Sequence, residues 1–262
     1  MNAPSPSSSS VGNSDLAARL RQIGEERYHH RHPFHLRMHE GQLTRGQLQA
    51  WALNRYYYQS RIPIKDAAIL ARCEDADLRR AWRKRITDHD GDGNPAKPGG
   101  IEKWLRLVEA TGLKREQALN GEGVLPATRF AVDAYVHLVS EKSLLEAIAS
   151  SLTEMFSGSL ITLRMDRLRQ HYPWLSGGLA YFEGRLTQAP EDANFALDWV
   201  TQHARTPAEK DLACNALRAK CDILWAQLDA LYFAYVEPAW PPPGAFRIAD
   251  QDAISEAGRE KA

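Results

Sequence analysis

Residues 44–72 read TRGQLQAWALNRYYYQSRIPIKDAAILAR, and this stretch decides the fold class. Thr44 and Gln47 stand three positions apart, the spacing of a capping box that satisfies free amide groups at the start of a helix. Apolar residues then recur every three or four positions, as they do along one face of an α-helix. Pro63 falls inside this pattern and predicts a bend. The stretch therefore predicts one long amphipathic helix.

The same helical period runs through almost every segment between Asp15 and Tyr235, without a convincing strand pattern. Further capping signals occur at Ser143 with Glu146, and at Thr206 just before a proline. The predicted helices are 14–30, 44–72, 75–90, 100–111, 126–139, 143–156, 158–171, 177–203 and 207–236. The sequence therefore predicts an all-α fold, a helical bundle with about seven main helices.

The two ends of the chain differ from its middle in composition. Residues 1–13 are rich in serine and predict a disordered arm. Residues 238–262 are rich in proline at their start and predict an extended tail or linker. The helical-bundle domain is therefore expected at 14–237, with a glycine- and proline-rich loop at 91–100 between two of its helices.

Charge and cysteine content narrow the function classes. The chain has 33 basic and 33 acidic residues among 262, so its net charge gives no reason to expect nucleic acid or an anionic membrane as a partner. Its three cysteines form no CxxC pair, which is typical of reduced thiols. No apolar stretch approaches the roughly 20 residues of a membrane span, and the first residues do not resemble a secretory signal. We expect a cytoplasmic protein.

Polar side chains fall on the apolar faces of several predicted helices. Arg55 and Gln59 share the stripe that begins at Leu48, and Lys220 lies within the stripe of the last helix. A buried unpaired charge costs several kcal/mol, so such groups pair inside the protein or bind a ligand, unless each long side chain reaches water. The other polar residues on stripes are Arg85, His89, Tyr135, Glu154, Arg164, Tyr181 and Arg185.

Acidic partners for these cations are few, since only Glu154, Asp222 and Asp229 stand near the stripes. A central cavity lined by arginine, lysine, tyrosine and histidine would suit a small, planar ligand with several carboxylates. The pattern of charges therefore predicts an anion-binding cavity inside the bundle.

Five of the nine histidines lie in residues 28–39, YHHRHPFHLRMH. A di-metal site in a helical bundle needs glutamate and histidine one turn apart on facing helices, yet no histidine lies three, four or seven residues after Glu154. We therefore predict no metal site and expect helix-end positions for three histidines and proton transfer for one or two others. The three expected at a helix end are His30, His35 and His39. The alternative metal ligands are His29, His32 and His39.

Seven stretches, in order along the chain, together resemble the pyrroloquinoline-quinone synthases. They are YHHRHPFH (28–35), NRYYYQSRIPIKDAAI (54–69), DHDGDG (88–93), LPATRFAVDAY (125–135), SSLTEMF (150–156), HYPWL (171–175) and KCDILWAQLDA (220–230). The similarity extends from about residue 16 to 236, which makes it far more specific than any short motif.

The resemblance implies a compact heme-oxygenase-like helical bundle that forms a homodimer. It also implies a cofactor-independent oxidase that needs neither metal nor flavin. Such an enzyme carries out the final step of pyrroloquinoline quinone biosynthesis, closing a ring in a reduced quinoline polycarboxylate and removing eight electrons. Molecular oxygen is the co-substrate and hydrogen peroxide is released. A peptide-chaperone domain, fused after the C-terminal tail or separate, is a further partner that the resemblance suggests.

Matching motifs also imply roles for individual residues. His89 would be the principal base, His29 would line the active site, and Tyr181 and Arg185 would face the bound ring near the oxygen site. The implied substrate-binding residues are Tyr28, Arg55, Gln59, Lys65, Arg85, Tyr135, Thr153, Glu154, Arg164 and Lys220.

One position departs from the family pattern, which usually has a histidine seven residues after the glutamate, where this chain has Ile161. Peroxide stabilisation would then rest on Tyr181 and Arg185, and slower late oxidation steps are expected. Other functions stay open as alternatives. They are a di-iron oxygenase, a thiaminase-like hydrolase with a nucleophile such as Cys221, and a non-enzymatic carrier of the finished quinone.

Overall fold

The computed structural model describes residues 8–248, and these contain eleven α-helices, three 3-10 helices and no strand. The prediction of an all-α fold is confirmed, with more helices than the seven expected. The elements are α1 (Ser8–Arg27), η1 (His29–Arg31), α2 (Pro33–His39), α3 (Arg45–Arg72), α4 (Ala76–Asp90), α5 (Gly100–Thr111), α6 (Arg115–Asn120), α7 (Pro126–Glu141), α8 (Leu144–Ser150), η2 (Ser151–Phe156), α9 (Ser157–His171), η3 (Pro173–Gly178), α10 (Ala180–His203) and α11 (Pro207–Tyr235).

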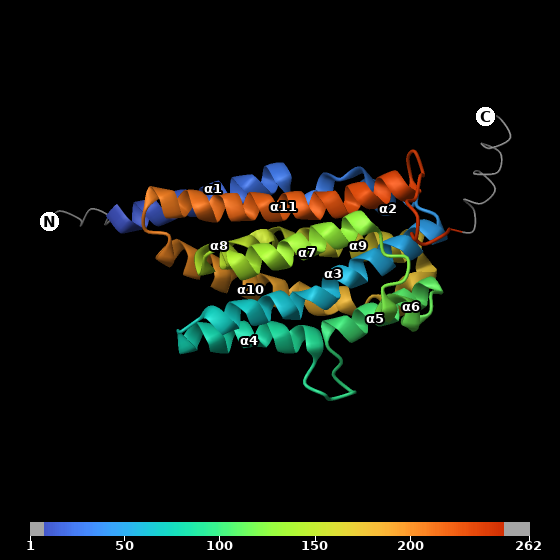
Figure 1. Ribbon diagram of the computed structural model, residues 1–262, viewed down its shortest axis with the longest axis horizontal. Helices are drawn as coiled ribbons and strands as arrows, with labels where there is room; N and C mark the ends of the chain where they lie inside the picture. Colours follow the sequence, from blue (N-terminus) through green and yellow to red (C-terminus); the bar gives the residue numbers. More distant parts are fainter. Residues whose placement is uncertain (1–7, 249–262) are drawn as a thin grey trace.

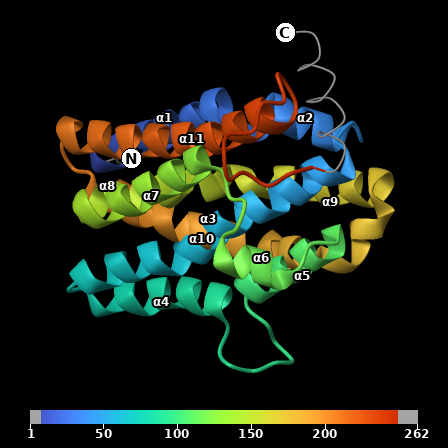
Figure 2. The ribbon, with the colours of Figure 1, turned by 45° about the vertical axis from the view of Figure 1, so that its right-hand side comes forward.

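The long helices form an elongated bundle (Figure 1). Helices α1 and α11 lie side by side along one edge, and α4 and α5 form the opposite edge (Figures 1 and 2). Between them α3 contacts α4, α5 and α7, while α10 contacts α9 and η2. This arrangement gathers the polar stripes of α3, α9 and α10 in the middle of the bundle.

The predicted capping signals are confirmed. The Thr44 side chain accepts a hydrogen bond from the Gln47 amide and the reciprocal bond is present, so α3 starts where its capping box indicates. The same reciprocal box starts α8 at Ser143 and α11 at Thr206. Helix α3 continues through Pro63 to Arg72 as one helix.

Several boundaries differ from the prediction. Helix α1 begins at Ser8, so residues 8–13 are helical instead of belonging to an arm, and residues 1–7 lie outside the described part. The short α6 was missed. Residues 143–156, expected as one α-helix, tighten into 3-10 geometry from Ser151 onward.

The proline-rich tail packs on the bundle as far as it is described. The Phe246 amide donates to the Gly123 carbonyl at 3.0 Å, and Ile248 is buried. Gly46 leaves the room for Ile248, because a Cβ atom at Gly46 would lie 2.1 Å from the Ile248 Cγ2. Residues 238–248 thus have no helix or strand but pack on the bundle, and residues 249–262 lie outside the described part.

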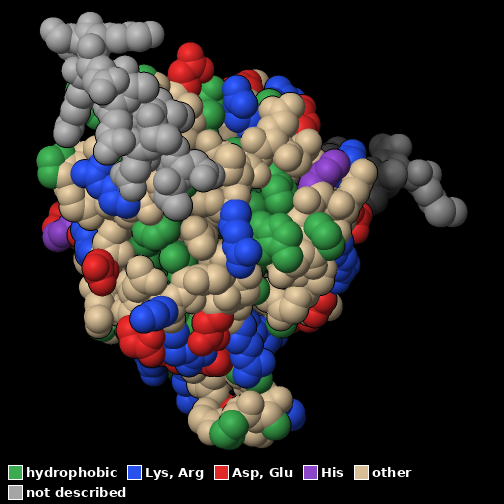
Figure 3. All heavy atoms as spheres, turned by 90° about the vertical axis from the view of Figure 1, so that its right-hand side faces the viewer, with side chains coloured by type: hydrophobic (Ala, Val, Ile, Leu, Met, Phe, Trp, Pro, Cys, Tyr) green, Lys and Arg blue, Asp and Glu red, His purple; other side chains and the backbone are tan. Residues whose placement is uncertain are grey.

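The loop of residues 91–99 projects from the end of α4, at the bottom of Figures 1 and 3. Above it, Figure 3 shows basic and acidic side chains interspersed. Among the residues that the structure describes, no helix has the length and apolar character needed to cross a membrane.

Candidate active site

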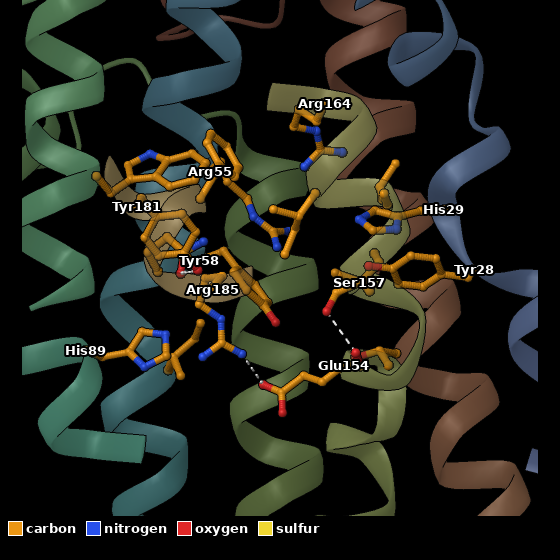
Figure 4. A pocket seen from close by; sticks show the side chains of 18 residues that line it. Tyr28, His29, Arg55, Tyr58, His89, Glu154, Ser157, Arg164, Tyr181 and Arg185 are labelled. Atoms are coloured by element: carbon orange, nitrogen blue, oxygen red, sulfur yellow. Dashed lines mark hydrogen bonds and ion pairs between the residues drawn. The ribbon is translucent and has the colours of Figure 1, made fainter. Parts of the chain in front are cut away.

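A cavity of about 680 Å³ lies in the middle of the bundle (Figure 4). Its walls come from η1, α3, η2, α9 and α10, with single residues from α4, α5 and α11. Ten of the fourteen predicted site residues line it. They are Tyr28, His29, Arg55, Gln59, His89, Thr153, Glu154, Arg164, Tyr181 and Arg185. The polar stripes of separate helices thus meet in one place, as their positions on apolar faces predicted.

The other four predicted residues lie behind the cavity wall instead of on it. They are Lys65, Arg85, Tyr135 and Lys220. Lys220 donates to the Tyr58 hydroxyl at 2.8 Å, and its ammonium lies 3.3 Å from the centre of the Tyr135 ring. These residues hold wall residues in place, and the structure does not bring them onto the cavity surface.

Arg85 illustrates this supporting position. Its two terminal nitrogens donate to the two carboxylate oxygens of Glu154 at 2.7 and 2.8 Å. Burial alone would raise the pKa of Glu154, but attraction to Arg85 and Arg185 outweighs it and lowers the pKa to about 2. Glu154 is therefore a permanent anion at neutral pH. Its charge is already shared between two arginines.

Two further buried carboxylates stand beside Arg85, Glu154 and Arg185, and the sequence analysis did not include them. We call this group of paired charges the ionic wall. Asp66 lies 2.5 Å from the Lys65 ammonium and accepts from the Trp82 indole at 2.8 Å. Asp192 lies 3.3 Å from a terminal nitrogen of Arg185. The sequence analysis therefore named too few acidic partners for the buried cations.

The other two acids named there do not line the cavity. Asp222 pairs with Arg27 at 2.9 Å, and both side chains are largely exposed. Asp229 pairs with His32 at 3.0 Å. Neither aspartate balances a cation at the site.

On the other side of the cavity, two arginines have no carboxylate partner among the residues that the structure describes. The Arg55 guanidinium lies 4.0 Å from the centre of the Tyr58 ring. The Arg164 Nη2 lies 3.1 Å from His35 Nε2. Burial and the neighbouring Arg55 lower the pKa of Arg164 to about 10, so it stays charged at neutral pH under strong repulsion. This wall is cationic and favours an anionic ligand.

His89 sits at the C-terminal end of α4 with a defined proton position. Its Nδ1 lies 3.0 Å from the Arg85 carbonyl oxygen, which can only accept a hydrogen bond. Nδ1 therefore carries the proton and Nε2 keeps a lone pair. Burial and the charge of Arg185 lower the pKa of His89 to about 4, so the neutral form dominates at neutral pH. The ring can act as a base.

Other histidines of residues 28–39 belong to the helix α2 or to its start. His32, which the sequence analysis did not expect at a helix end, caps α2 by accepting from the Phe34 amide at 3.0 Å. His39 is the last residue of α2 and His30 lies in η1 just after α1, as expected, whereas His35 lies inside α2. His35 and His39 are buried along α2. In the part of the chain that the structure describes, no three His, Cys, Asp or Glu side chains converge as a metal site would need.

Some residues on the cavity surface escaped the sequence analysis. Tyr58 lies next to the stripe that contains Arg55, and Phe182 is adjacent to Tyr181 in sequence, so the position of each could have indicated the cavity. The others come from apolar stripes or turns without such a signal. They are Ile62, Trp104, Ser157, Leu160 and Leu224.

Two residues that the sequence analysis discussed for other reasons can now be placed. Ile161, the departure from the family pattern, does line the cavity. Cys221 is fully buried and lies off the cavity surface, and burial raises the pKa of its thiol to about 12. A cysteine nucleophile is not favoured at this position.

Comparison with solved structures identifies the fold class of this helical bundle. Solved structures share this fold at low sequence identity. One is a domain from Shewanella denitrificans described as having a heme oxygenase-like fold, with a TM-score of 0.68 at 12% identity over 90% of this chain and 96% of that one. A TenA homolog from Pseudomonas syringae also gives 0.68 at 12% identity, over 89% and 99%. The heme-oxygenase-like fold is confirmed.

Residues 17–230 match the family described as TENA/THI-4/PQQC, and the chain belongs to that family. It is 57% identical to the pyrroloquinoline-quinone synthase of Xanthomonas axonopodis pv. citri over 93% of this chain and 96% of that protein. A second synthase, from Granulibacter bethesdensis, is also 57% identical, over 88% and 91%.

The bifunctional coenzyme PQQ synthesis protein C/D of Methylorubrum extorquens is 57% identical as well. There the match covers 90% of this chain but 63% of that protein. The resemblance to pyrroloquinoline-quinone synthases is therefore confirmed by relatives matched along nearly their whole length.

Proposed function

We propose that this chain is a cofactor-independent oxidase of pyrroloquinoline quinone biosynthesis. In the proposed reaction, a reduced quinoline polycarboxylate undergoes ring closure and an eight-electron oxidation by molecular oxygen, with hydrogen peroxide released. Similarity to named pyrroloquinoline-quinone synthases supports the pathway. The observation that carries the proposal is the cationic wall of Arg55 and Arg164, which have no carboxylate partner within the described residues.

Carboxylate binding is the first part of the proposal. Arg55 and Arg164 each present a planar set of donors that suits a carboxylate, and both are held by aromatic rings or imidazole instead of an acid. A polyanionic ligand would relieve their mutual repulsion. Clamping the carboxylates at this end would hold a flexible amino-acid arm near the ring carbon that it attacks.

Proton transfer is the second part. His89 Nε2 keeps its lone pair because Nδ1 donates to the Arg85 carbonyl, so the ring is a base of fixed orientation. In the proposed step it takes a proton from a ring carbon while the electron pair moves into the quinone. The low pKa of His89, about 4, makes the protonated ring a strong acid that readily returns the proton.

Oxygen reduction is the third part. Each quinol would give two electrons and two protons to one oxygen molecule, forming hydrogen peroxide. The Arg185 guanidinium, paired with Glu154 and Asp192, lies at the cavity surface as a hydrogen-bond donor, and the Tyr181 hydroxyl, which donates to Gln59 at 3.0 Å, lies beside it. Ile161 adds an apolar surface where a histidine is usual, so we propose slower late oxidation steps.

The assembly is proposed on the same resemblance. We propose a homodimer and a peptide-chaperone domain, fused or separate, as the partner that delivers substrate. Mass measurement in solution tests the first. The second would be tested by copurification with a peptide-chaperone domain supplied as a separate chain.

A metal-stripped, aerobic reaction with the reduced quinoline precursor tests the central proposal. Quinone absorbance and peroxide would be followed beyond one enzyme equivalent, with an Arg164→Met variant as control. Multiple turnovers without metal are expected. A single equivalent of retained product would instead indicate a quinone carrier, and activity restored only by iron would indicate a di-iron oxygenase.

A further inference from the structure

A second, smaller chamber lies behind His29. It has about 20 Å³ open to the centre of a water molecule, which is room for about one water, and it shares His29, Arg55 and Arg164 with the main cavity. The remaining walls come from α2, α3, α7 and α11. They are His35, Trp51, Asn54, Thr128, Gln227, Leu228 and Leu231. The chamber therefore lies against the main cavity, and the residues that hold the anionic ligand in the proposed function form the boundary between the two.

Three polar atoms of this chamber's residues have no hydrogen-bonding partner among the described residues. They are His29 Nδ1, Thr128 Oγ1 and Arg164 Nε. All three residues are more than nine-tenths buried. Asn54, by contrast, uses both ends of its amide, donating to Ala50 O at 2.8 Å and accepting from Leu125 N at 2.9 Å. Buried polar atoms normally have a partner, so three such atoms around one polar chamber point to a bound polar molecule.

The three atoms differ in whether they donate or accept hydrogen bonds, and this limits which molecule can bind all of them. Arg164 Nε can only donate, His29 Nδ1 either donates or accepts, and the Thr128 hydroxyl can do both. Water fits all three, because it accepts from Arg164 and has two protons left to donate. A lone pair on His29 Nδ1 is also favoured by the charges of Arg55 and Arg164, which line the same chamber.

We infer that Thr128 is a positioning residue that, through a water molecule in this chamber, holds His29 in the tautomer with a lone pair on Nδ1 and the proton on Nε2. His29 would then present an N–H donor to the main cavity. This is the opposite of His89, whose Nδ1 must carry the proton because it donates to a carbonyl. The two histidines of the site thus divide the tasks of donor and base.

The tautomer of His29 matters because its ring is neutral. Burial, followed by the charges of Arg55 and Arg164 and then of Lys220, holds its pKa well below the ordinary value. A neutral imidazole donates from one nitrogen alone, so its tautomer decides what a ligand encounters. His32 and His35, the neighbouring imidazoles, also have lowered pKa values. The charges of the three cationic side chains, and that of His32, all lower the pKa of His29 and so disfavour the protonated ring.

The test compares Thr128→Val, which keeps the shape and removes the hydroxyl, with Thr128→Ser, which keeps the hydroxyl. Thr162→Val, at an exposed position on α9, is the matched control. Long-range proton–nitrogen NMR of histidine-labelled protein reads the tautomer of His29, whose signal is assigned with a His29→Gln variant. Turnover of the reduced quinoline precursor gives kcat and KM, and thermal unfolding reports stability.

We expect Thr128→Val to shift the His29 tautomer and to lower kcat on the order of tenfold with little change in KM, because a displaced donor acts on the reacting complex. Thr128→Ser and Thr162→Val should match the wild type. An unchanged tautomer in Thr128→Val overturns the inference. So does a raised melting temperature, since removing a hydroxyl that has no water partner would stabilise the fold.

The kinetic part rests on the proposed function, and the spectroscopic part does not. A tautomer shift in a protein that never turns over the quinoline precursor would uphold the inference and reject the proposed function. Turnover with an unaffected tautomer would do the reverse.

Discussion

Replacing Arg164 with methionine should make the ligand-free protein more stable and its ligand binding weaker. Burial and repulsion from Arg55 lower the pKa of this guanidinium from 12.5 to about 10. Since one pKa unit corresponds to about 1.4 kcal/mol, the charged form destabilises the fold by roughly 3 kcal/mol. Arg164 is only 8% exposed, so solvent screens little of this. The folded pKa is the lower one, so the destabilisation is present at every pH below about 10.

Methionine removes the charge but also the contact with His35, so we expect a net gain of about 1–2 kcal/mol in the free energy of unfolding. For a chain of this size that is a rise of roughly 2–4 °C in melting temperature. Loss of a charge-assisted hydrogen bond should weaken binding of the quinone product roughly 10- to 100-fold. Thermal unfolding of the ligand-free protein and titration with pyrroloquinoline quinone measure the two effects.

Arg167→Met is the control, because Arg167 lies on the same helix, is exposed and donates to Gln170 at 3.0 Å. It should change neither quantity. Arg164→Lys should keep the instability and lose part of the affinity, since ammonium lacks the planar fork. A variant Arg164→Met that is less stable than wild type and binds product equally well would refute the reasoning, because Arg164 would then be satisfied within the protein.

Three further predictions concern the ionic wall, the oxygen site and a helix start. Glu154→Gln should cost about 3 kcal/mol at pH 7 and about 1 kcal/mol near pH 3. The reason is that the folded pKa, about 2, lies below the ordinary 4.5, so the stabilisation is present above pH 4.5 and is lost as pH falls toward 2. Urea unfolding of both proteins at the two pH values measures it, and a pH-independent difference would contradict the assignment. Ile161→His should speed the late oxidation steps in single-turnover absorbance traces; traces identical to wild type would remove Ile161 as the cause of slow oxidation. Thr206→Ala should destabilise by about 1 kcal/mol, because the Glu209 amide loses its side-chain acceptor. Chemical unfolding measures it, and no change would mean that α11 is fixed by packing alone.

Local chemistry made the helices predictable. Capping boxes at Thr44, Ser143 and Thr206 are complete within four residues, so their bonds follow from sequence without knowledge of the fold. The same holds for cavity residues such as Arg55 and Arg164, because a charge on an apolar stripe starts on the side of the helix that faces the interior of a bundle. Conversely, His32 could have been recognised as a cap, since the residue before a proline at N1 occupies that position.

The ionic wall was less predictable, because it depends on how helices cross. Lys65 and Asp66 are adjacent in sequence, and adjacent residues do not normally face each other on a helix. They meet because α4 packs on α3 and brings the Trp82 indole to the same aspartate at 2.8 Å. Asp192 did have a signal, since it lies two turns after Arg185 on the same face of α10.

The division of charge between the two sides of the cavity constrains how a polyanion can bind. Arg185 is held between Glu154 and Asp192, at 3.2 and 3.3 Å, so its charge is largely balanced by the protein. Arg164 lies across the cavity from His89 in Figure 4, and its own charge is not balanced by a carboxylate within the described residues. A ligand with several carboxylates gains most when these lie toward Arg164, because an anionic group near Glu154 would meet a like charge. The uncharged edge of a planar ligand is thereby directed toward His89, where a ring C–H would meet the lone pair of Nε2. Under the proposed function, the positions of the charges thus favour the orientation that the proton transfer needs.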